Sequence, residues 1–234
     1  MMKYLLVALL SCFVCIACDK QEEERMTDVT TTSELKEGDL LFCVQQNKNA
    51  ISEVTQGFNG ENIPHVAIFH NDSTGSFALE ASFMGVKLTP IDKFKKWLKL
   101  NKVPYVLVGR LKNRDNIEAS VQNAMKYIGK RYDFKFDSTD DEIYCSELIQ
   151  LCYKDKADNL IFKPIPMSFH DSTGVVTDYW KKYYARWKME VPEGAPGSNP
   201  GNLSMSNQLN IVHRWLYDNQ SFIRLQLSSE TKSV

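Results

Sequence analysis

Short apolar runs and amphipathic segments follow one another through the first two thirds of the chain. Apolar runs bounded by glycine, proline or polar turn residues predict strands over 39–44, 65–70, 77–82, 85–88 and 105–111. Apolar residues at helical spacing predict helices over 91–100 and 117–128, the second ended by Gly129. The polar segment 45–64 is expected to be a loop.

The pattern changes toward the C-terminus. An acidic turn over 137–142 leads into a predicted helix that begins near Cys145. The elements expected after it are an aromatic helix over 175–187, a turn-rich stretch over 191–206 and a final strand over 209–216.

The N-terminus has the pattern of an export signal. Lys3 precedes an apolar, uncharged run over 4–17 that is too short to span a bilayer as a helix. The sequence Cys15-Ile16-Ala17-Cys18 resembles the lipobox of bacterial lipoproteins, although that motif prefers leucine where Cys15 stands. Residues 1–17 are therefore expected to be a lipoprotein signal peptide and Cys18 the lipid attachment site. An ordinary cleaved signal peptide is the alternative.

The domain organisation follows from this reading. A multiply acylated Cys18 would hold the protein stably at a membrane, so the expected location is the cell envelope, anchored to the outer membrane and facing the periplasm or the cell surface. Residues 18–34 are polar and charge-dense and are expected to form a flexible tether. Residues 35–234 suffice for a single domain. The net charge of −1 leaves no basic excess, so nucleic acid is not an expected partner.

The cysteine content points to a free thiol. Two of the six cysteines leave with the leader and Cys18 is expected to be lipidated, which leaves Cys43, Cys145 and Cys152. Three is an odd number for an oxidising compartment. If Cys145 and Cys152 share a helix, they lie about 10 Å apart along its axis, too far for a disulfide. At least one thiol is therefore expected to be free.

Three residues combine into a candidate catalytic set. Cys145 lies in the first turn of its predicted helix, where the peptide dipoles favour the thiolate. His65 opens a strand directly after Pro64, at the rim of a sheet. Glu80 stands in an apolar strand, one strand after His65, and therefore requires a partner. Taken singly, these residues have structural alternatives: a buried thiol, a solvated strand-end histidine and a solvent-facing glutamate.

Short motifs around these residues carry a family resemblance. They are Gly38-Asp39-Leu40-Leu41-Phe42, His65-Val66-Ala67-Ile68, Leu79-Glu80-Ala81 with Gly85-Val86, Tyr132-Asp133-Phe134 and Tyr144-Cys145-Ser146-Glu147-Leu148. In this order they resemble the YiiX/YebB-like family, NlpC-type cysteine hydrolases with a circularly permuted papain fold. The histidine precedes the cysteine, as the permutation requires. The segment from about 155 to 234 matches poorly and is expected to be a subgroup-specific extension.

The resemblance implies an α+β fold in which an antiparallel sheet packs against helices, including the nucleophile helix. It implies that Cys145 is the nucleophile, His65 the base and Glu80 the carboxylate that orients His65. Tyr144 is expected to line the substrate pocket. In the implied mechanism Cys145 attacks a carbonyl and an acyl-enzyme forms. The sequence holds no metal signature and no phosphate-binding glycine loop, so neither a metal nor a cofactor is expected.

These expectations describe an exported, lipid-anchored thiol hydrolase that cleaves an amide or acyl bond. The first candidate is an amidase or peptidase acting on cell-wall peptides. The second is a lipid-directed acyl hydrolase or acyltransferase, because relatives of the permuted fold handle acyl groups. The third is a catalytically idle binding lipoprotein, which the complete set of Cys145, His65 and Glu80 disfavours. The sequence does not separate the first two.

Overall fold

The computed structural model describes residues 26–138 and 141–218. The strands are β1 (Thr27–Val29), β2 (Leu40–Gln45), β3 (Asn62–Asp72), β4 (Gly75–Ser82), β5 (Gly85–Pro90), β6 (Val106–Leu111), β7 (Ile165–Pro166), β8 (Pro196–Gly197) and β9 (Leu209–Trp215). The helices are α1 (Ala50–Glu53), the 3-10 turn η1 (Phe58–Gly60), α2 (Ile91–Leu100), α3 (Ile117–Met125), α4 (Cys145–Cys152), α5 (Asp178–Ala185) and α6 (Pro200–Ser204).

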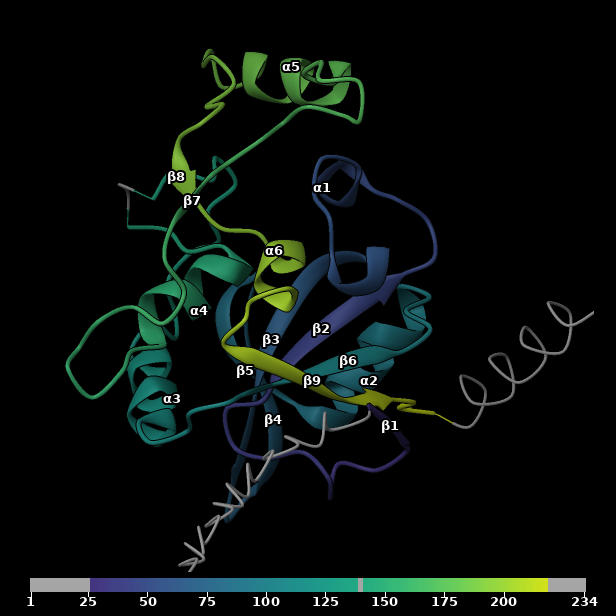
Figure 1. Ribbon diagram of the computed structural model, residues 1–234, viewed down its shortest axis with the longest axis vertical. Coiled ribbons are helices and arrows are strands. Elements are labelled where there is room, and N and C mark those ends of the chain that lie inside the picture. Colours follow the sequence, from purple (N-terminus) through teal and green to yellow (C-terminus); the bar gives the residue numbers. More distant parts are fainter. Residues whose placement is uncertain (1–25, 139–140, 219–234) are drawn as a thin grey trace, which may run out of the picture.

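One large sheet organises the molecule, with strand order β1-β9-β6-β2-β3-β4-β5 (Figure 1). Its neighbouring strands are antiparallel, except that β1 and β9 are parallel. Because side chains alternate along a strand, Leu40 and Phe42 of β2 enter one apolar cluster while Leu41 and Cys43 enter another. The first cluster contains α3 and α4 side chains, and the second contains α2 side chains. Helices therefore cover both faces, and the expected α+β class is confirmed.

A buried ion pair joins the start of β2 to β6. Asp39 is fully buried and accepts two hydrogen bonds from Arg110, at 2.9 Å from Nε and 2.6 Å from Nη2. Arg114 lies 3.3 Å from the same carboxylate, and the Lys36 backbone N–H donates to it at 2.8 Å. A buried carboxylate is tolerated only when paired in this way, so the interaction defines how this end of β2 is held.

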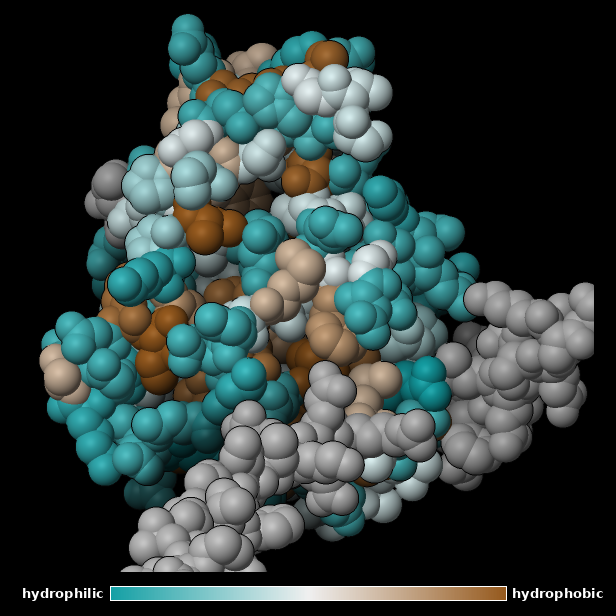
Figure 2. Space-filling model, in the orientation of Figure 1, coloured by the Kyte–Doolittle hydropathy of each residue, from teal (hydrophilic) through white to brown (hydrophobic). Residues whose placement is uncertain are grey.

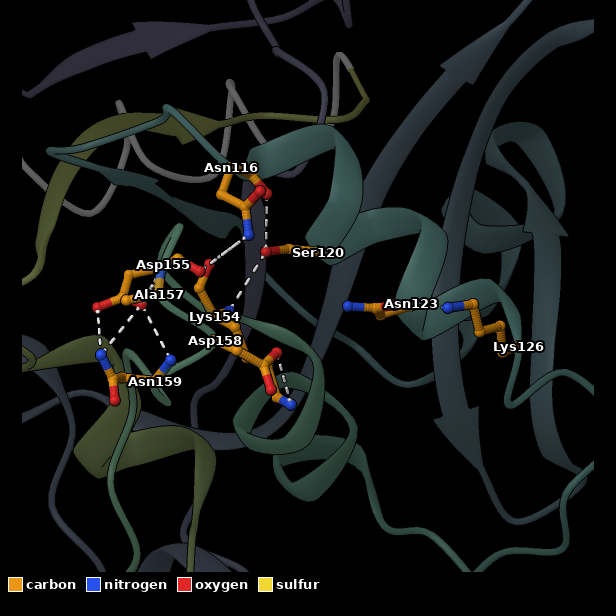
Figure 3. A network of polar contacts seen from close by, with 9 residues as sticks. All are labelled: Asn116, Ser120, Asn123, Lys126, Lys154, Asp155, Ala157, Asp158 and Asn159. Atoms are coloured by element: carbon orange, nitrogen blue, oxygen red, sulfur yellow. Dashed lines mark hydrogen bonds and ion pairs between the residues drawn. The ribbon is translucent and has the colours of Figure 1, made fainter.

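Polar contacts secure α4 against α3. Figure 3 shows the chain leaving α4 held beside the start of α3, where Asn116 Nδ2 donates to the Lys154 carbonyl at 3.0 Å. The Lys154 backbone N–H donates to Ser120 Oγ at 3.4 Å, and the Lys154 ammonium pairs with Asp158 at 3.0 Å. The contacts fix the C-terminal end of the helix that begins at Cys145.

Two short α-helices occur where the sequence predicts loop or turn. In the predicted loop 45–64, Asn49 caps α1 by accepting from the backbone N–H groups of Ile51 and Ser52, both at 3.0 Å. In the turn-rich stretch 191–206, Asn199 accepts from the Asn202 N–H at 2.8 Å and caps α6. Asparagine caps stabilise turns of helix too short to show an apolar period, which is why the pattern missed both.

The helix predicted over 117–128 ends earlier, at Met125. Beyond it, Ile128 donates to the carbonyl three residues back, and Gly129 donates to the Val86 carbonyl at 2.9 Å. Pairing with β5 therefore replaces the last expected helical turn. The aromatic helix expected over 175–187 is likewise shorter, as α5.

Both ends of the described chain add strands to the sheet. β1 lies within the segment assigned above to the tether, and pairs with β9. Arg214 of β9 holds Asp28 with two hydrogen bonds of 2.8 and 2.7 Å. β9 in turn belongs to the segment assigned to an extension, yet it lies inside the sheet beside β6. Pairing between distant segments decides both placements.

Residues 165–197 form a separate layer, which we call the aromatic cap. Its core is Met167, Phe169, Trp180 and Tyr184, all buried. Trp180 Nε1 donates to the Ala50 carbonyl at 3.1 Å, which ties the cap to α1. Figure 1 places α5 at one end of the molecule, away from the large sheet.

Candidate active site

His65 and Glu80 lie on neighbouring strands and contact each other. His65 belongs to β3 and Glu80 to β4, and these strands pair antiparallel. The His65 Nε2 atom lies 2.8 Å from Glu80 Oε2, and Glu80 is 4% exposed. The acidic residue in an apolar strand therefore has the partner that its burial demands.

The second oxygen of Glu80 is also bound. Thr89 of β5 donates its hydroxyl to Oε1 at 2.7 Å, and Lys87 Nζ lies 3.7 Å from the same oxygen. Burial alone would raise the pKa of Glu80, but the interactions with His65, Thr89 and Lys87 outweigh it and lower that pKa below its ordinary value. Glu80 is thus a carboxylate at neutral pH.

Cys145 is the first residue of α4 and meets His65. Cys145 lies near enough to the imidazole of His65 to raise its pKa, and because Nε2 faces Glu80, Nδ1 is the nitrogen left for sulfur. Burial would lower the pKa of His65. The interactions with Cys145 and then Glu80 outweigh this effect and raise that pKa to about 10. The structure therefore brings together sulfur, imidazole and carboxylate, three residues predicted from separate motifs.

Trp97 is a member of the site that the sequence analysis did not identify. Its ring centroid lies 5.3 Å from that of His65, and its indole stacks on Phe94 within α2. The apolar spacing of α2 marked Phe94 as a core residue, but it carried no signal that Trp97 would lie against an imidazole. The indole limits the movement of the His65 ring on the side that α2 covers.

A small apolar pocket opens beside Cys145. Its walls come from distant parts of the chain: α1, the Tyr132 segment, the start of α4, the aromatic cap and the start of α6. The apolar side chains in these walls are Ile51, Val54, Phe136, Met167, Phe169, Trp180 and Pro200. Such a lining favours an uncharged, apolar group next to the thiol.

Two tyrosines line this pocket. Tyr144, expected there from its position before Cys145, is nearly fully buried, and its hydroxyl accepts from the Ser198 N–H at 3.0 Å. Tyr132 lines the same pocket, and burial followed by the charge of Cys145 raises its pKa well above the ordinary value. Both phenols remain protonated at neutral pH.

The other described cysteines are free, buried thiols. Cys43 pairs with His65 across β2 and β3 and its side chain enters the α2-side cluster, where burial raises its pKa well above the ordinary value. Burial also raises the pKa of Cys152 to about 12. The proposed lipid site, Cys18, lies outside the described residues. Among the helices that the structure describes, none is long and apolar enough to cross a membrane.

Histidine, glutamate and cysteine follow in that order along the chain and meet at the start of a helix that packs on an antiparallel sheet. This is the arrangement of a papain-like cysteine hydrolase whose elements are circularly permuted. The chain belongs to the permuted papain-like amidase family, YaeF/YiiX, C92, whose family model matches residues 34–213. The resemblance inferred from the motifs is thereby confirmed, together with the fold class and the cysteine hydrolase class. The match continues well beyond residue 155, where the sequence analysis placed an extension.

Two relatives illustrate the similarity. The uncharacterised protein YiiX of Escherichia coli strain K12 is 29% identical over 121 residues, which cover 50% of this chain and 56% of that protein. The matching part thus spans about half the length of this curated relative. A crystal structure of YiiX from Escherichia coli O157:H7, described as a metalloprotein, aligns with a TM-score of 0.62 at 21% identity. The alignment covers 77% of this chain and 98% of that one, and shows a shared fold.

In residues 26–138 and 141–218, no group of three or more His, Cys, Asp or Glu side chains is placed to hold a metal ion.

Proposed function

We propose that this amidase uses Cys145 as nucleophile, His65 as base and acid, and Glu80 as the carboxylate that orients His65. The observation that carries the proposal is the 2.8 Å contact between the His65 imidazole and a buried carboxylate, beside a thiol that raises the pKa of the same imidazole. Sγ of Cys145 attacks the amide carbon, and the C–N bond breaks as His65 gives its proton to the leaving amine. Water then attacks the thioester, and the thiol is regenerated.

The start of α4 supports stabilisation of the oxyanion that forms in each step. The backbone N–H of Cys145 lies in the first helical turn, where N–H groups lack partners within the helix. The preceding N–H, that of Tyr144, is directed to Glu147 Oε2 at 3.3 Å. The Cys145 N–H is therefore the donor that we assign to the oxyanion.

The pocket beside Cys145 supports a substrate with an apolar acyl part. A muropeptide stem carries charged groups, whereas the described walls next to the thiol consist of aliphatic and aromatic side chains with a few hydroxyls and amides. We therefore favour an amide of an apolar acyl group, which is the lipid-directed alternative of the sequence analysis. Cleavage of a cell-wall peptide stays a prediction, and the experiment below includes it.

The substrate proposal is tested with acyl p-nitroanilides of increasing chain length and with purified muropeptides. We expect kcat/KM to rise with acyl length, and acid quenching to trap an acyl adduct on the Cys145 peptide. Val54→Asp places a charge in the pocket wall and should abolish the preference for long chains, while iodoacetamide still labels Cys145 at the wild-type rate. Leu100→Asp, at an exposed position on α2, is the control. Turnover of muropeptides with no response to acyl length would contradict the lipid-directed proposal.

We also propose that Cys18 carries the lipid anchor and that the protein resides at the outer membrane. Support comes from the apolar run that ends at Cys15-Ile16-Ala17-Cys18. Cells grown with a labelled fatty acid should yield labelled protein whose N-terminal residue is Cys18, and Cys18→Ala should be unlabelled. Unlabelled wild-type protein that begins elsewhere would refute the anchor.

A further inference from the structure

Four large apolar side chains lie exposed close to the candidate active site. Phe83 and Met84, at the turn between β4 and β5, are 68% and 71% exposed. Phe134 and Trp187 are 41% and 45% exposed, and all four line one groove together with Lys135 and with Arg131, which pairs with Glu142 of the same groove at 2.7 Å. We call Phe83, Met84, Phe134 and Trp187 the apolar rim. Exposed apolar side chains gathered on one surface mark an interaction site more often than isolated ones do.

The apolar rim is joined to a basic helix. The Tyr183 hydroxyl donates to the Phe134 carbonyl at 2.7 Å, and the Tyr184 hydroxyl to the Lys135 carbonyl at 2.9 Å, which fixes α5 against the rim. The Lys135 ammonium lies 5.7 Å from the centre of the Trp187 ring. The groove and the helix thus form one continuous surface.

The charge of this surface is opposite to that of the whole chain. Residues 178–189 carry four cationic side chains and one anionic one, a net charge of +3, whereas the chain has a net charge of −1. The cations are all exposed, and they are Lys181, Lys182, Arg186 and Lys188. Figure 2 shows hydrophobic surface interleaved with hydrophilic surface over the end of the molecule that carries α5. The surface therefore matches a partner that is both anionic and apolar.

The rim also lies beside the opening of the site. Tyr132 lines the rim groove with Phe83 and Trp187, and it lines the pocket that contains Cys145. Phe83 further lines a groove that contains Glu80. A partner seated on the rim would therefore be adjacent to the thiol.

We propose that the apolar rim and α5 dock this chain onto a bilayer surface that contains anionic lipid. Tryptophan and phenylalanine enter the boundary between headgroups and acyl chains, while lysine and arginine pair with anionic headgroups. The side chains needed for both interactions lie side by side here. The docking surface is independent of the Cys18 anchor and of the acyl pocket, since it uses residues that belong to neither the thiol site nor the N-terminus.

The fluorescence of Trp187 tests this docking in the full chain. The chain has four tryptophans, of which Trp180 and Trp215 are buried and Trp97 is half-buried. Brominated phosphatidylglycerol in mixed vesicles should quench the emission of the wild type, and Trp187→Phe should remove that quenching. An N-terminal anchor alone would bring the chain to the vesicle without placing Trp187 in contact with lipid.

Charge variants with a matched control complete the test. Lys181→Gln with Lys182→Gln should raise the lipid concentration for half-maximal quenching about 30-fold, because each basic residue near an anionic surface contributes about fivefold. Leu100 is an exposed apolar residue on α2, and Leu100→Ser should leave the lipid concentration for half-maximal quenching unchanged. Melting temperatures equal to the wild type verify folding. Three results would overturn the proposal. They are equal quenching in neutral vesicles, no effect of the lysine changes, and quenching that persists in Trp187→Phe. Binding of the chain to soluble heparin, with no quenching of Trp187 by the brominated lipid, would also overturn it.

Discussion

The Nε2 atom of His65 lies 2.8 Å from Oε2 of Glu80, across two adjacent strands of the sheet. This contact determines which ring nitrogen is left for Cys145, and it places a negative charge where an imidazolium needs one. The other oxygen of Glu80 is held by Thr89 at 2.7 Å, so the carboxylate has little freedom to turn away. The orientation of His65 therefore depends on β3, β4 and β5 together.

Replacing Glu80 by Gln should reduce amidase activity without unfolding the protein. The amide can still bond His65, but it cannot stabilise the imidazolium, so kcat/KM should fall roughly 10- to 10⁴-fold. In a Cys145→Ala background, Glu80→Gln should lower the residual kcat/KM hardly any further. Glu61→Gln, at a glutamate that accepts from Tyr105 instead, is the matched control and should retain activity. Full activity of Glu80→Gln would exclude it from the site.

The alkaline limit of activity should follow His65. Because the pKa of His65 is raised from its ordinary 6.5 to about 10, the imidazolium that protonates the leaving amine persists into alkaline solution. The alkaline limb of the kcat/KM profile is expected near pH 10 in the wild type and at lower pH in Glu80→Gln. Profiles measured with one uncharged amide substrate decide this. Identical limbs in the two proteins would contradict the assigned partner.

The same pKa makes folding stability depend on pH. A group whose pKa is raised in the folded state contributes fully below its unfolded value, here about 6.5, and the contribution is lost as the pH rises through about 10. Glu80, whose pKa is lowered, contributes above its unfolded value of about 4.5 and loses the contribution in acid. The melting temperature difference between wild type and His65→Gln should therefore narrow between pH 6 and pH 10.5. A constant difference would show that His65 gains no proton-linked stability.

Cys145 should react with iodoacetamide faster than the other two described cysteines. It lies at the start of α4 beside His65 and lines the pocket, whereas burial raises the pKa of Cys43 and Cys152. Peptide mapping after brief alkylation of the native chain measures all three. His65→Ala should slow the labelling of Cys145 and leave the other two unchanged. Equal rates at all three positions would argue against an activated thiol.

Loss of the buried carboxylate Asp39 should destabilise the whole domain. Asp39→Ala leaves Arg110 and Arg114 without their partner next to the core, which should cost about 3–5 kcal/mol in the free energy of unfolding. Asp28→Ala removes a partly exposed ion pair with Arg214 and should cost less than about 1 kcal/mol. Urea denaturation of the two variants compares them directly. Similar losses would mean that the Asp39 pair is no more important than a surface pair.

Much of the sheet and the candidate site residues could be predicted from local sequence. Alternation of apolar side chains located β2, β4 and β6 to within a few residues, and apolar spacing located α2 with its full bounds. An acidic residue in an apolar strand and a cysteine at a helix start are anomalies that require an explanation, and they drew attention to Glu80 and Cys145. Local patterns suffice here because burial imposes them on consecutive residues.

The rest was decided by contacts between segments far apart in the chain. β1 exists because it pairs with β9, and nothing in its own polar sequence predicts a strand. Trp97 lies against His65 because α2 packs on that face of the sheet, and the pocket beside Cys145 closes only when Phe169 and Trp180 of the aromatic cap reach it. Sequence alone singled out Cys145, His65 and Glu80 as candidates, since residue types and their neighbours along the chain are local facts. Tertiary packing determined what surrounds the thiol, because a pocket wall is built from side chains whose proximity no local period encodes.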